Sequence, residues 1–393
     1  MAEQRNRRLI APCFAMAVLA VGNTCAAPQD RLLLLTPAPG SPIALGDGPG
    51  NVALGRVNQD GRLDLVVAAG GGITVLFGQG DGRFRVAPGS PIKLPAACTE
   101  MTSGDFNGDR KLDLALANHD SYGVMLLFGD GSGGFALAPH LPVIMKEGKR
   151  PHTHGLNAGD LNGDGMIDLV SVNSDDNDLS IVFGDNKGGF TRAAAPFAVG
   201  RSPYPGVLGD LNGDGHLDIV SSSAARQTSP HAASSGELTV LISDGRGGFR
   251  GAPVPLRTVS PGFVAVADLN GDRKLDLLAT HLERSDLTIL IGDGTGAFKE
   301  TARSPLDLGH PVWQFAVADV NGDGKADVAA AAGDGVRLML GDGQGGFQRA
   351  PGSPFATGKG AWQLAVGDVN GDGKPDVVTG DQEGRTVTVL LAR

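Results

Sequence analysis

One nine-residue stretch of this chain reads Asp319-Val320-Asn321-Gly322-Asp323-Gly324-Lys325-Ala326-Asp327. Its pattern, Asp-x-Asn-Gly-Asp-Gly/Arg-x-x-Asp, begins at six positions, Asp105, Asp160, Asp210, Asp268, Asp319 and Asp368, and a degenerate first copy begins at Arg56. The seven copies follow one another at intervals of about 50 residues. A near-constant period of this length is the signature of a repeat architecture.

Each period also contains the same series of short apolar runs. In the copy at 319–327, the run 315–318 leads into the loop, 328–332 follows it, and a third run covers 336–340. The third run usually ends in a turn such as Gly-Asp-Gly-Gln-Gly-Gly-Phe at 341–347, and a Pro-containing extended piece completes the period. Short apolar runs between Gly and Asp predict strands joined by tight turns. We therefore predict an all-β fold, a seven-bladed β-propeller of four-stranded antiparallel blades.

The two ends of the chain predict how the ring closes. The last period stops after its third run, at Leu391, without a fourth strand. Near the other end, Ala-Pro-Gly-Ser-Pro-Ile at 38–43 matches Ala-Pro-Gly-Ser-Pro-Phe at 350–355. We expect the N-terminal strand to complete the blade that holds Asp368, which would leave no open sheet edge.

The first 27 residues have the composition of a signal peptide. Three arginines, at positions 5, 7 and 8, precede an apolar stretch at 9–21 and small residues at 23–27. We predict removal of residues 1–27 and export of the protein to the periplasm, the medium or the cell surface, with 28–393 as a single propeller domain. Lipid attachment at Cys25 is an alternative. No other apolar run approaches the ~18 residues of a membrane span, so we expect no transmembrane segment in the mature chain.

Composition narrows the possible functions. The formal net charge is −10, with no basic stripe to neutralise phosphates, which argues against nucleic acid as a partner. Loss of the signal peptide would leave Cys98 as the only cysteine, so no intramolecular disulfide is expected and Cys98 is interpreted as a small core residue. The sequence makes no prediction about oligomeric state.

The loops have the chemistry of metal sites. Positions 1, 3, 5 and 9 carry oxygen ligands, the backbone carbonyl at position 7 can add another, and position 6 is often Gly. Calcium accepts six to eight oxygen ligands in flexible geometry, whereas zinc prefers the His and Cys that are missing here. We predict about six structural Ca²⁺ ions. The predicted ligands are Asp105, Asn107, Asp109, Asp113, Asp160, Asn162, Asp164, Asp168, Asp210, Asn212, Asp214, Asp218, Asp268, Asn270, Asp272, Asp276, Asp319, Asn321, Asp323, Asp327, Asp368, Asn370, Asp372 and Asp376.

The copies differ in ways that predict differences between sites. Position 12 is never Glu and strands flank the loop, so the sites are not EF-hands. Arg110 and Arg273 replace Gly at position 6, which predicts weaker or differently bent sites. In the first copy we expect Arg56 to pair with Asp60 and Asp64 in place of an ion. The alternative is that the loops are Asx-turns without metal, but six clusters of unneutralised carboxylates would be costly.

These loops resemble the FG-GAP/VCBS repeats of integrin α-subunit propellers and of many bacterial exported proteins. The resemblance covers about residues 30–393. It implies a propeller with structural calcium in the loops. The family includes adhesive modules, fungal lectins and appended domains of polysaccharide-processing enzymes, so it leaves the ligand open.

One repeat position is unusually aromatic. Six residues before the first loop residue, which we call the rim position, stand Gly50, Thr99, His154, Tyr204, Gly262, Trp313 and Trp362. The chain has two Trp and two Tyr residues, and three of these four occur at the rim position. This position lies at the start of the predicted innermost strand. Rings around a channel mouth could stack on sugars or capture cations. The alternative is that they fill the channel or cover blade junctions.

Two histidines lie close to this position. His152 and His154 alternate, so both side chains should face one side of a strand. Such a pair can begin a metal site, but the sequence identifies no third ligand, and a hydrogen-bonded pair is the favoured interpretation. The candidate ligand-binding residues are His152, His154, Tyr204, Trp313 and Trp362.

The sequence thus predicts an exported, calcium-binding scaffold for binding or adhesion, with a carbohydrate or a surface protein as ligand. We assign no catalytic residues, because no blade shows a clustered acid and base. The largest departure from the repeat is the connection Ala224–Ser235, which holds His231 and Arg226. A polysaccharide lyase or hydrolase built on a propeller is the alternative, and a purely structural surface protein is a third possibility.

Overall fold

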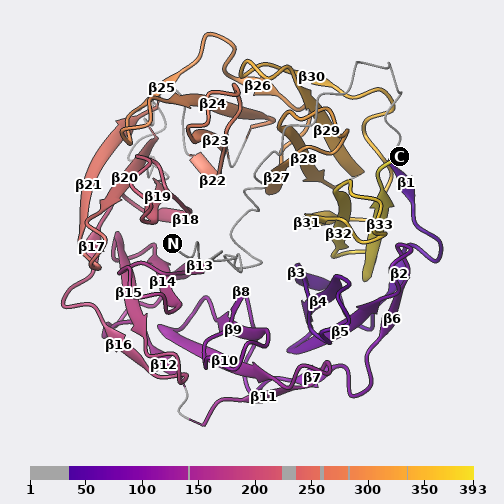
Figure 1. Ribbon diagram of the computed structural model, residues 1–393, viewed down its shortest axis with the longest axis horizontal. Coiled ribbons are helices and arrows are strands. Elements are labelled where there is room, and N and C mark those ends of the chain that lie inside the picture. Colours follow the sequence, from indigo (N-terminus) through magenta and orange to yellow (C-terminus); the bar gives the residue numbers. More distant parts are fainter. Residues whose placement is uncertain (1–34, 140–141, 224–235, 257–260, 282–283, 334) are drawn as a thin grey trace, which may run out of the picture.

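The computed structural model describes residues 35–139, 142–223, 236–256, 261–281, 284–333 and 335–393. None of these residues forms a helix, so this part of the chain contains no helix with the length and hydrophobicity needed to cross a membrane. Seven small antiparallel sheets stand around a common axis (Figure 1). This arrangement confirms the predicted seven-bladed β-propeller. The predicted signal peptide at 1–27 and the connection at 224–235 lie outside the described residues.

Strands of the same rank occupy the same place in every blade. The innermost strands, each leading into a nine-residue loop, are β3 (Pro49–Gly55), β8 (Glu100–Gly104), β13 (Thr153–Gly159), β18 (Pro203–Gly209), β22 (Pro261–Ala267), β27 (Gln314–Ala318) and β31 (Ala361–Gly367). The second strands are β4 (Asp64–Ala69), β9 (Asp113–Ala117), β14 (Asp168–Asn173), β19 (Asp218–Ser223), β23 (Asp276–His281), β28 (Asp327–Ala332) and β32 (Asp376–Asp381). The third strands are β5 (Gly72–Gly78), β10 (Gly123–Gly129), β15 (Asp178–Gly184), β20 (Glu237–Ser243), β24 (Asp286–Gly292), β29 (Gly335–Gly341) and β33 (Thr386–Leu391).

The outer edge of most blades is made of two short pieces rather than one strand. The fourth strands are β6 (Phe84–Val86), β11 (Phe135–Leu137), β16 (Phe190–Arg192), β21 (Phe249–Pro255), β25 (Phe298–Glu300), β30 (Phe347–Arg349) and β1 (Thr36–Pro37). A further two-residue piece pairs with the third strand in five blades: β2 (Ile43–Ala44), β7 (Ile92–Lys93), β12 (Val143–Ile144), β17 (Phe197–Ala198) and β26 (Leu306–Asp307). The third strand is therefore covered along most of its length.

The ring closes as the sequence predicts. Thr36 of β1 pairs with Leu391 of β33, and Ile43 of β2 pairs with Val387 of the same strand. The Ser41 hydroxyl also accepts a hydrogen bond from the Val389 backbone N–H at 2.8 Å. In Figure 1 the indigo β1 lies beside the yellow β33, so the first and last described segments share one blade.

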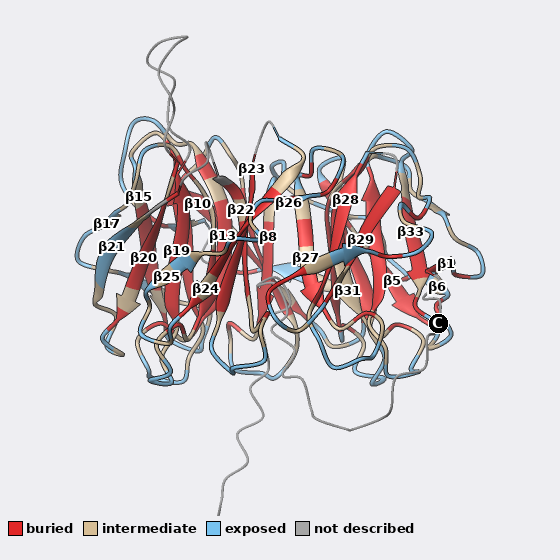
Figure 2. Cartoon of the chain, turned by 90° about the horizontal axis from the view of Figure 1, so that it is seen from above, coloured by how far each residue is buried: buried red, intermediate tan, exposed pale blue. Residues whose placement is uncertain are grey.

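The core lies between the blades. Ala115 and Leu126 of one blade pack in the same buried cluster as Leu156, Leu169 and Val182 of the next. The middle strands are buried on both faces, and in Figure 2 they form a red band between the more exposed loops. This is why their sequences are almost continuously apolar instead of alternating.

The topology places the loops and the rim position at opposite faces of the disc. Each inner strand begins at the rim position and ends at its loop, and the blades are related by rotation about one axis. A strand of five to seven residues spans roughly 17–23 Å. The turn between the second and third strands returns to the rim face. The two groups of candidate residues therefore lie toward opposite faces of the disc.

Candidate functional site

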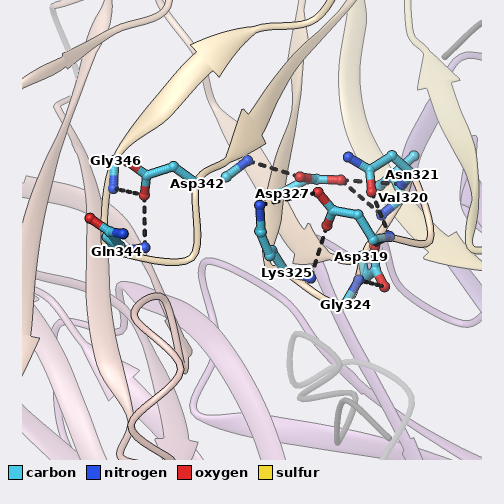
Figure 3. Close-up of polar contacts among 11 residues, drawn as sticks. Asp319, Val320, Asn321, Gly324, Lys325, Asp327, Asp342, Gln344 and Gly346 are labelled. Atoms are coloured by element: carbon cyan, nitrogen blue, oxygen red, sulfur yellow. Dashed lines mark hydrogen bonds and ion pairs between the residues drawn. The ribbon is translucent and has the colours of Figure 1, made fainter. Parts of the chain in front are cut away.

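The side chains of each complete loop accept hydrogen bonds from the loop's own backbone. In the loop shown in Figure 3, Asp319 Oδ2 accepts from the Gly324 N–H at 2.8 Å, and Asn321 Oδ1 accepts from the Asp323 N–H at 2.7 Å. Asp323 Oδ1 accepts from the Lys325 N–H at 3.0 Å. The alternating oxygens of the motif thus fold the loop into a compact turn.

The last Asp of every loop is a buried link between two strands. Asp113 Oδ2 accepts from the Phe106 N–H at 3.0 Å, and its Oδ1 accepts from the N–H of Gly129, the last residue of β10, at 2.9 Å. All seven last-position residues have no exposed surface: Asp64, Asp113, Asp168, Asp218, Asp276, Asp327 and Asp376. This carboxylate therefore holds the blade together, and any bound ion would have to share its oxygens with the backbone.

Burial makes these carboxylates hard to ionise. It raises the pKa of Asp113 to about 6 and that of Asp168 and Asp327 to about 7, against an ordinary value near 4. The carboxylates at positions 1 and 5 of the same loop raise the pKa further, while backbone hydrogen bonds lower it. Without a cation, these buried carboxyls are therefore partly protonated near neutral pH, and a bound cation would favour their ionised form.

The loop carboxylates are directed to backbone N–H groups rather than to one common point. Among the residues that the structure describes, the only set of three His, Cys, Asp or Glu ligand atoms within 4.8 Å of one another consists of histidines. Calcium binding in the loops stays a prediction, and it requires the Asp side chains to turn toward the ion.

Two predicted differences between the loops can be compared with the backbone. Arg110 and Arg273 have φ angles of 64° and 66°, close to the 81° of Gly165 at the same position. The expectation that these loops bend differently is therefore wrong, because arginine adopts the left-handed conformation that the turn requires. The expected weaker ion binding stays a prediction.

The proposed pairing of Arg56 is also wrong. Arg56 is exposed and forms no ion pair with Asp60 or Asp64, all three being described residues. Asp64 is fully buried and accepts hydrogen bonds from the backbone of Val57 and Gly78. The guanidinium therefore stays in water, where it remains hydrated.

At the opposite face, the rim residues line one cavity, which continues along the channel as far as Asp368 and Gly373 of the last loop. Its volume is about 770 Å³. Six of the seven rim positions contribute to its wall: Gly50, Thr99, His154, Tyr204, Trp313 and Trp362. Gly262 does not, but the neighbouring Phe263 does. The rings thus share one mouth, as their common repeat position requires, and are not buried between blades.

Trp313 and Trp362 form an aromatic pair on this wall. They come from adjacent blades, with ring centroids 4.8 Å apart and ring planes at 34°. Trp313 is 41% exposed, which is unusual for so large an apolar side chain. Between these blades the Gln314 side-chain oxygen accepts a hydrogen bond from the Leu364 N–H at 2.9 Å. The pair therefore stands at a hydrogen-bonded junction of two blades and is open to the cavity.

A second group on the rim contains a residue that sequence reasoning missed. His119, in the turn between β9 and β10, has its ring centroid 4.2 Å from that of His152 and 4.9 Å from that of His154. The expectation that the His-x-His pair has no third partner is corrected, because the preceding blade supplies one. The available signal was topological: the turn between second and third strands lies at the rim face.

The three imidazoles have well-defined partners. Nε2 of His154 lies 2.9 Å from Nε2 of His152, which confirms the predicted hydrogen-bonded pair. The His154 ring stacks on Tyr204, with centroids 4.7 Å apart and planes at 14°. Burial, followed by the neighbouring His152 and His119, lowers the pKa of His154 to about 4, so its ring is neutral at neutral pH.

Two further titratable groups line the cavity. Burial raises the pKa of Glu100 to about 7, although the Gly155 backbone N–H opposes the shift. Burial also raises the pKa of the Cys98 thiol to about 12. Cys98 was expected to be a small core residue; it is half-buried, packs against a core cluster and also lines the cavity. The cavity therefore combines an acid, imidazole, a phenol and two indoles.

With this geometry established, the repeats can be compared with known proteins. A model of the FG-GAP-like repeat matches residues 56–116, 105–171, 160–221, 268–330 and 319–379. The chain belongs to the FG-GAP-like repeat family. Each match begins at the first residue of a nine-residue loop and ends just after the next loop. The FG-GAP-like unit therefore spans two neighbouring blades.

Solved structures share the fold of this FG-GAP-like chain at low sequence identity. An Agrocybe aegerita lectin, described by its specific recognition of non-reducing terminal N-acetylglucosamine, is 18% identical with a TM-score of 0.50, over 78% of this chain and 79% of the lectin. Two structures of BBS1N in complex with ARL6DN, soaked with lead and with mercury, are 12% and 14% identical with TM-scores of 0.60 and 0.59, each over 92% of this chain and 97% of the other. A search of curated proteins found no match. These similarities concern the fold alone.

Proposed function

We propose that this protein is an exported, calcium-binding scaffold that binds a carbohydrate at the rim of its propeller without transforming it. The exposed Trp313–Trp362 pair on the cavity wall carries this proposal. Indole faces can pack on the apolar faces of sugar rings while polar side chains bind the hydroxyl groups. The lectin with the same fold supports a glycan as the class of ligand.

The shape of the site favours a carbohydrate over a surface protein. A cavity of about 770 Å³ falls within the roughly 300–1,000 Å³ typical of small-ligand sites. A stable protein partner would instead cover about 800 Å² of each surface. The rings point into a concave mouth, which suits a chain end or a short oligosaccharide.

In this proposal calcium has a structural role at the other face. The six loops that begin with Asp would each hold one ion through positions 1, 3, 5 and 9. The carboxylate and amide oxygens at these four positions support this, because Ca²⁺ prefers such ligands. The ions would neutralise the loops, and the ion at the last loop would stand beside the cavity, because Asp368 lines it.

The Trp pair is tested by glycan binding. We expect Trp313→Ala and Trp362→Ala each to lower affinity at least about tenfold on a glycan array and in titration, since stacked aromatic contacts contribute roughly 1 kcal/mol or more. Trp313→Phe, which keeps a ring, should retain part of the affinity. Equal binding by all variants would refute the proposal, as would a large loss of thermal stability in both Ala variants, which would indicate channel-filling rings.

A hydrolase or lyase is the second candidate, because Glu100, His154 and Tyr204 line the same cavity. Burial raises the pKa of Glu100 to about 7, which suits proton transfer at neutral pH, whereas the lowered pKa of His154 and the raised pKa of Tyr204 keep both rings neutral there. Product analysis after prolonged incubation separates the two functions. A scaffold returns the bound glycan intact, whereas an enzyme returns shortened chains, and a lyase adds an unsaturated sugar that absorbs in the ultraviolet.

A further inference from the structure

We propose that His119, His152 and His154 form a site for a zinc-like divalent cation, built between two neighbouring blades at the rim. The three side chains offer ligand nitrogens that lie within 4.8 Å of one another. His152 and His154 come from the start of the blade β13–β16, and His119 comes from the β9–β10 turn of the preceding blade.

The backbone holds these three residues in register. The Thr153 N–H donates to the His119 carbonyl at 2.9 Å, and the Thr153 hydroxyl donates to the Ser121 carbonyl at 2.9 Å. The Ser174 N–H donates to the His152 carbonyl, also at 2.9 Å. Because main-chain bonds join the two blades here, a cation needs only small side-chain rotations to be bound.

The distances are close to those of a zinc site. Zinc binds imidazole nitrogen at ≈ 2.0–2.1 Å, which places tetrahedral ligand atoms about 3.3 Å apart. The Nε2 atoms of His152 and His154 are 2.9 Å apart and share a proton in the metal-free form. A cation that replaces this proton would widen the pair by a few tenths of an ångström.

Two carboxylates already orient the rings for this role. His152 Nδ1 lies 3.0 Å from Asp175 Oδ1, and His119 Nδ1 lies 2.8 Å from Asp120 Oδ1. Each carboxylate accepts a hydrogen bond from the Nδ1–H group. The proton therefore stays on Nδ1, and Nε2 is the nitrogen that can bind a metal. Histidine ligands of metals usually carry such a carboxylate or carbonyl partner on the second nitrogen.

The ligand set selects the class of cation. Three neutral imidazoles suit Zn²⁺, Co²⁺, Ni²⁺ or Cu²⁺, whereas Ca²⁺ and Mg²⁺ require oxygen ligands. Three protein ligands also leave a fourth position open. His119 and His154 line the cavity, so water or an oxygen atom of a bound molecule can take that position. This site is independent of the loop calcium sites at the other face.

Cobalt spectroscopy on the full chain, made without a histidine tag, tests the proposal. After chelation and dialysis into calcium buffer, we expect one Co²⁺ per chain with the visible bands of a low-coordinate site. Zn²⁺ should displace it and excess Ca²⁺ should not. X-ray absorption of the zinc-loaded protein should count three imidazole ligands.

Variants separate a built site from adventitious binding. His119→Ala and His154→Ala should each abolish the cobalt bands, and Asp175→Asn should weaken Zn²⁺ binding about 10–100-fold. His310→Ala is the matched control, because His310 lies outside the three-histidine cluster, with its Nδ1 2.8 Å from the Pro311 carbonyl oxygen, so the variant should bind metal as the wild type does.

The proposal is overturned if no saturable Co²⁺ spectrum forms at one ion per chain, or if binding survives in the His119→Ala and His154→Ala double variant. If those variants unfold, the imidazole count of the wild-type protein decides alone. The titration contains no glycan, so its result is independent of the proposed sugar binding.

Discussion

The position of Glu100 in the propeller changes the pKa of its carboxyl group. At the start of β8 its carboxyl faces the cavity, where Gly155 supplies a backbone N–H. Burial and, secondarily, the Glu100 charge raise the pKa of the nearby Tyr204. No cation pairs with Glu100 among the described residues. Sequence reasoning missed this residue, and also His119, because both acquire their partners from a neighbouring blade. The aromatic residues at the rim position could be predicted, because they repeat at the same place within each period.

The raised pKa of Glu100 predicts a specific pH dependence. An acid whose pKa in the folded state is about 7, against 4.5 ordinarily, lowers stability above pH 7, and this penalty disappears as the pH falls toward 4.5. Glu100→Gln should therefore be more stable than the wild type by up to roughly 3 kcal/mol at pH 8 and equal to it near pH 4.5. Urea denaturation at both pH values measures this difference. Glu147→Gln, at an exposed site, is the control, and a pH-independent difference between Glu100→Gln and wild type would contradict the prediction.

At the scale of the element, the loop and the end of the third strand form one unit. The N–H of Gly129 donates to the buried Asp113, and a Cβ at Gly129 would lie 2.2 Å from the Leu112 carbonyl oxygen. This explains why the third strand so often ends in Gly. The strands and their loops could be predicted from the pattern of apolar runs, whereas the division of the fourth strand into two pieces could not, because pairing with the third strand decides it.

The loop backbone also predicts which residue is strained. Arg110 has a φ angle of 64°, and a non-Gly residue in this region costs about 1–2 kcal/mol. Arg110→Gly should thus stabilise the protein by up to about 1 kcal/mol after the entropy cost of Gly is subtracted. Gly165→Ala is the converse change, at a site with open space around the added Cβ, and should destabilise by a similar amount. Denaturation midpoints that move in the opposite directions would refute this account.

At the scale of the whole molecule, the six separate loops that begin with Asp make any stabilisation by loop ions additive. A ligand present at 100 times its Kd stabilises the native state by about 2.7 kcal/mol per independent site. We therefore expect a chelator to lower the Tm clearly, Ca²⁺ to restore it, and Mg²⁺ to restore it less, because Mg²⁺ demands more rigid geometry. Identical melting curves with and without chelator would exclude structural calcium. The number of blades could be predicted from the period. The residues that meet across the channel could not, because their contacts depend on the three-dimensional ring.

The shared blade of β1 and β33 has a consequence for the order of assembly. Ser41 and Val389 are 348 residues apart in the sequence, yet they hydrogen-bond in the finished ring. Contacts of such long range form late, because the chain between them must first be brought together. The segment β1–β2 is therefore synthesised well before β33, the strand with which it pairs. Until residues near 391 are available, the seventh blade has an unpaired edge on which another chain could dock. The topology therefore also fixes an order of events: the ring closes only after β33 has been synthesised.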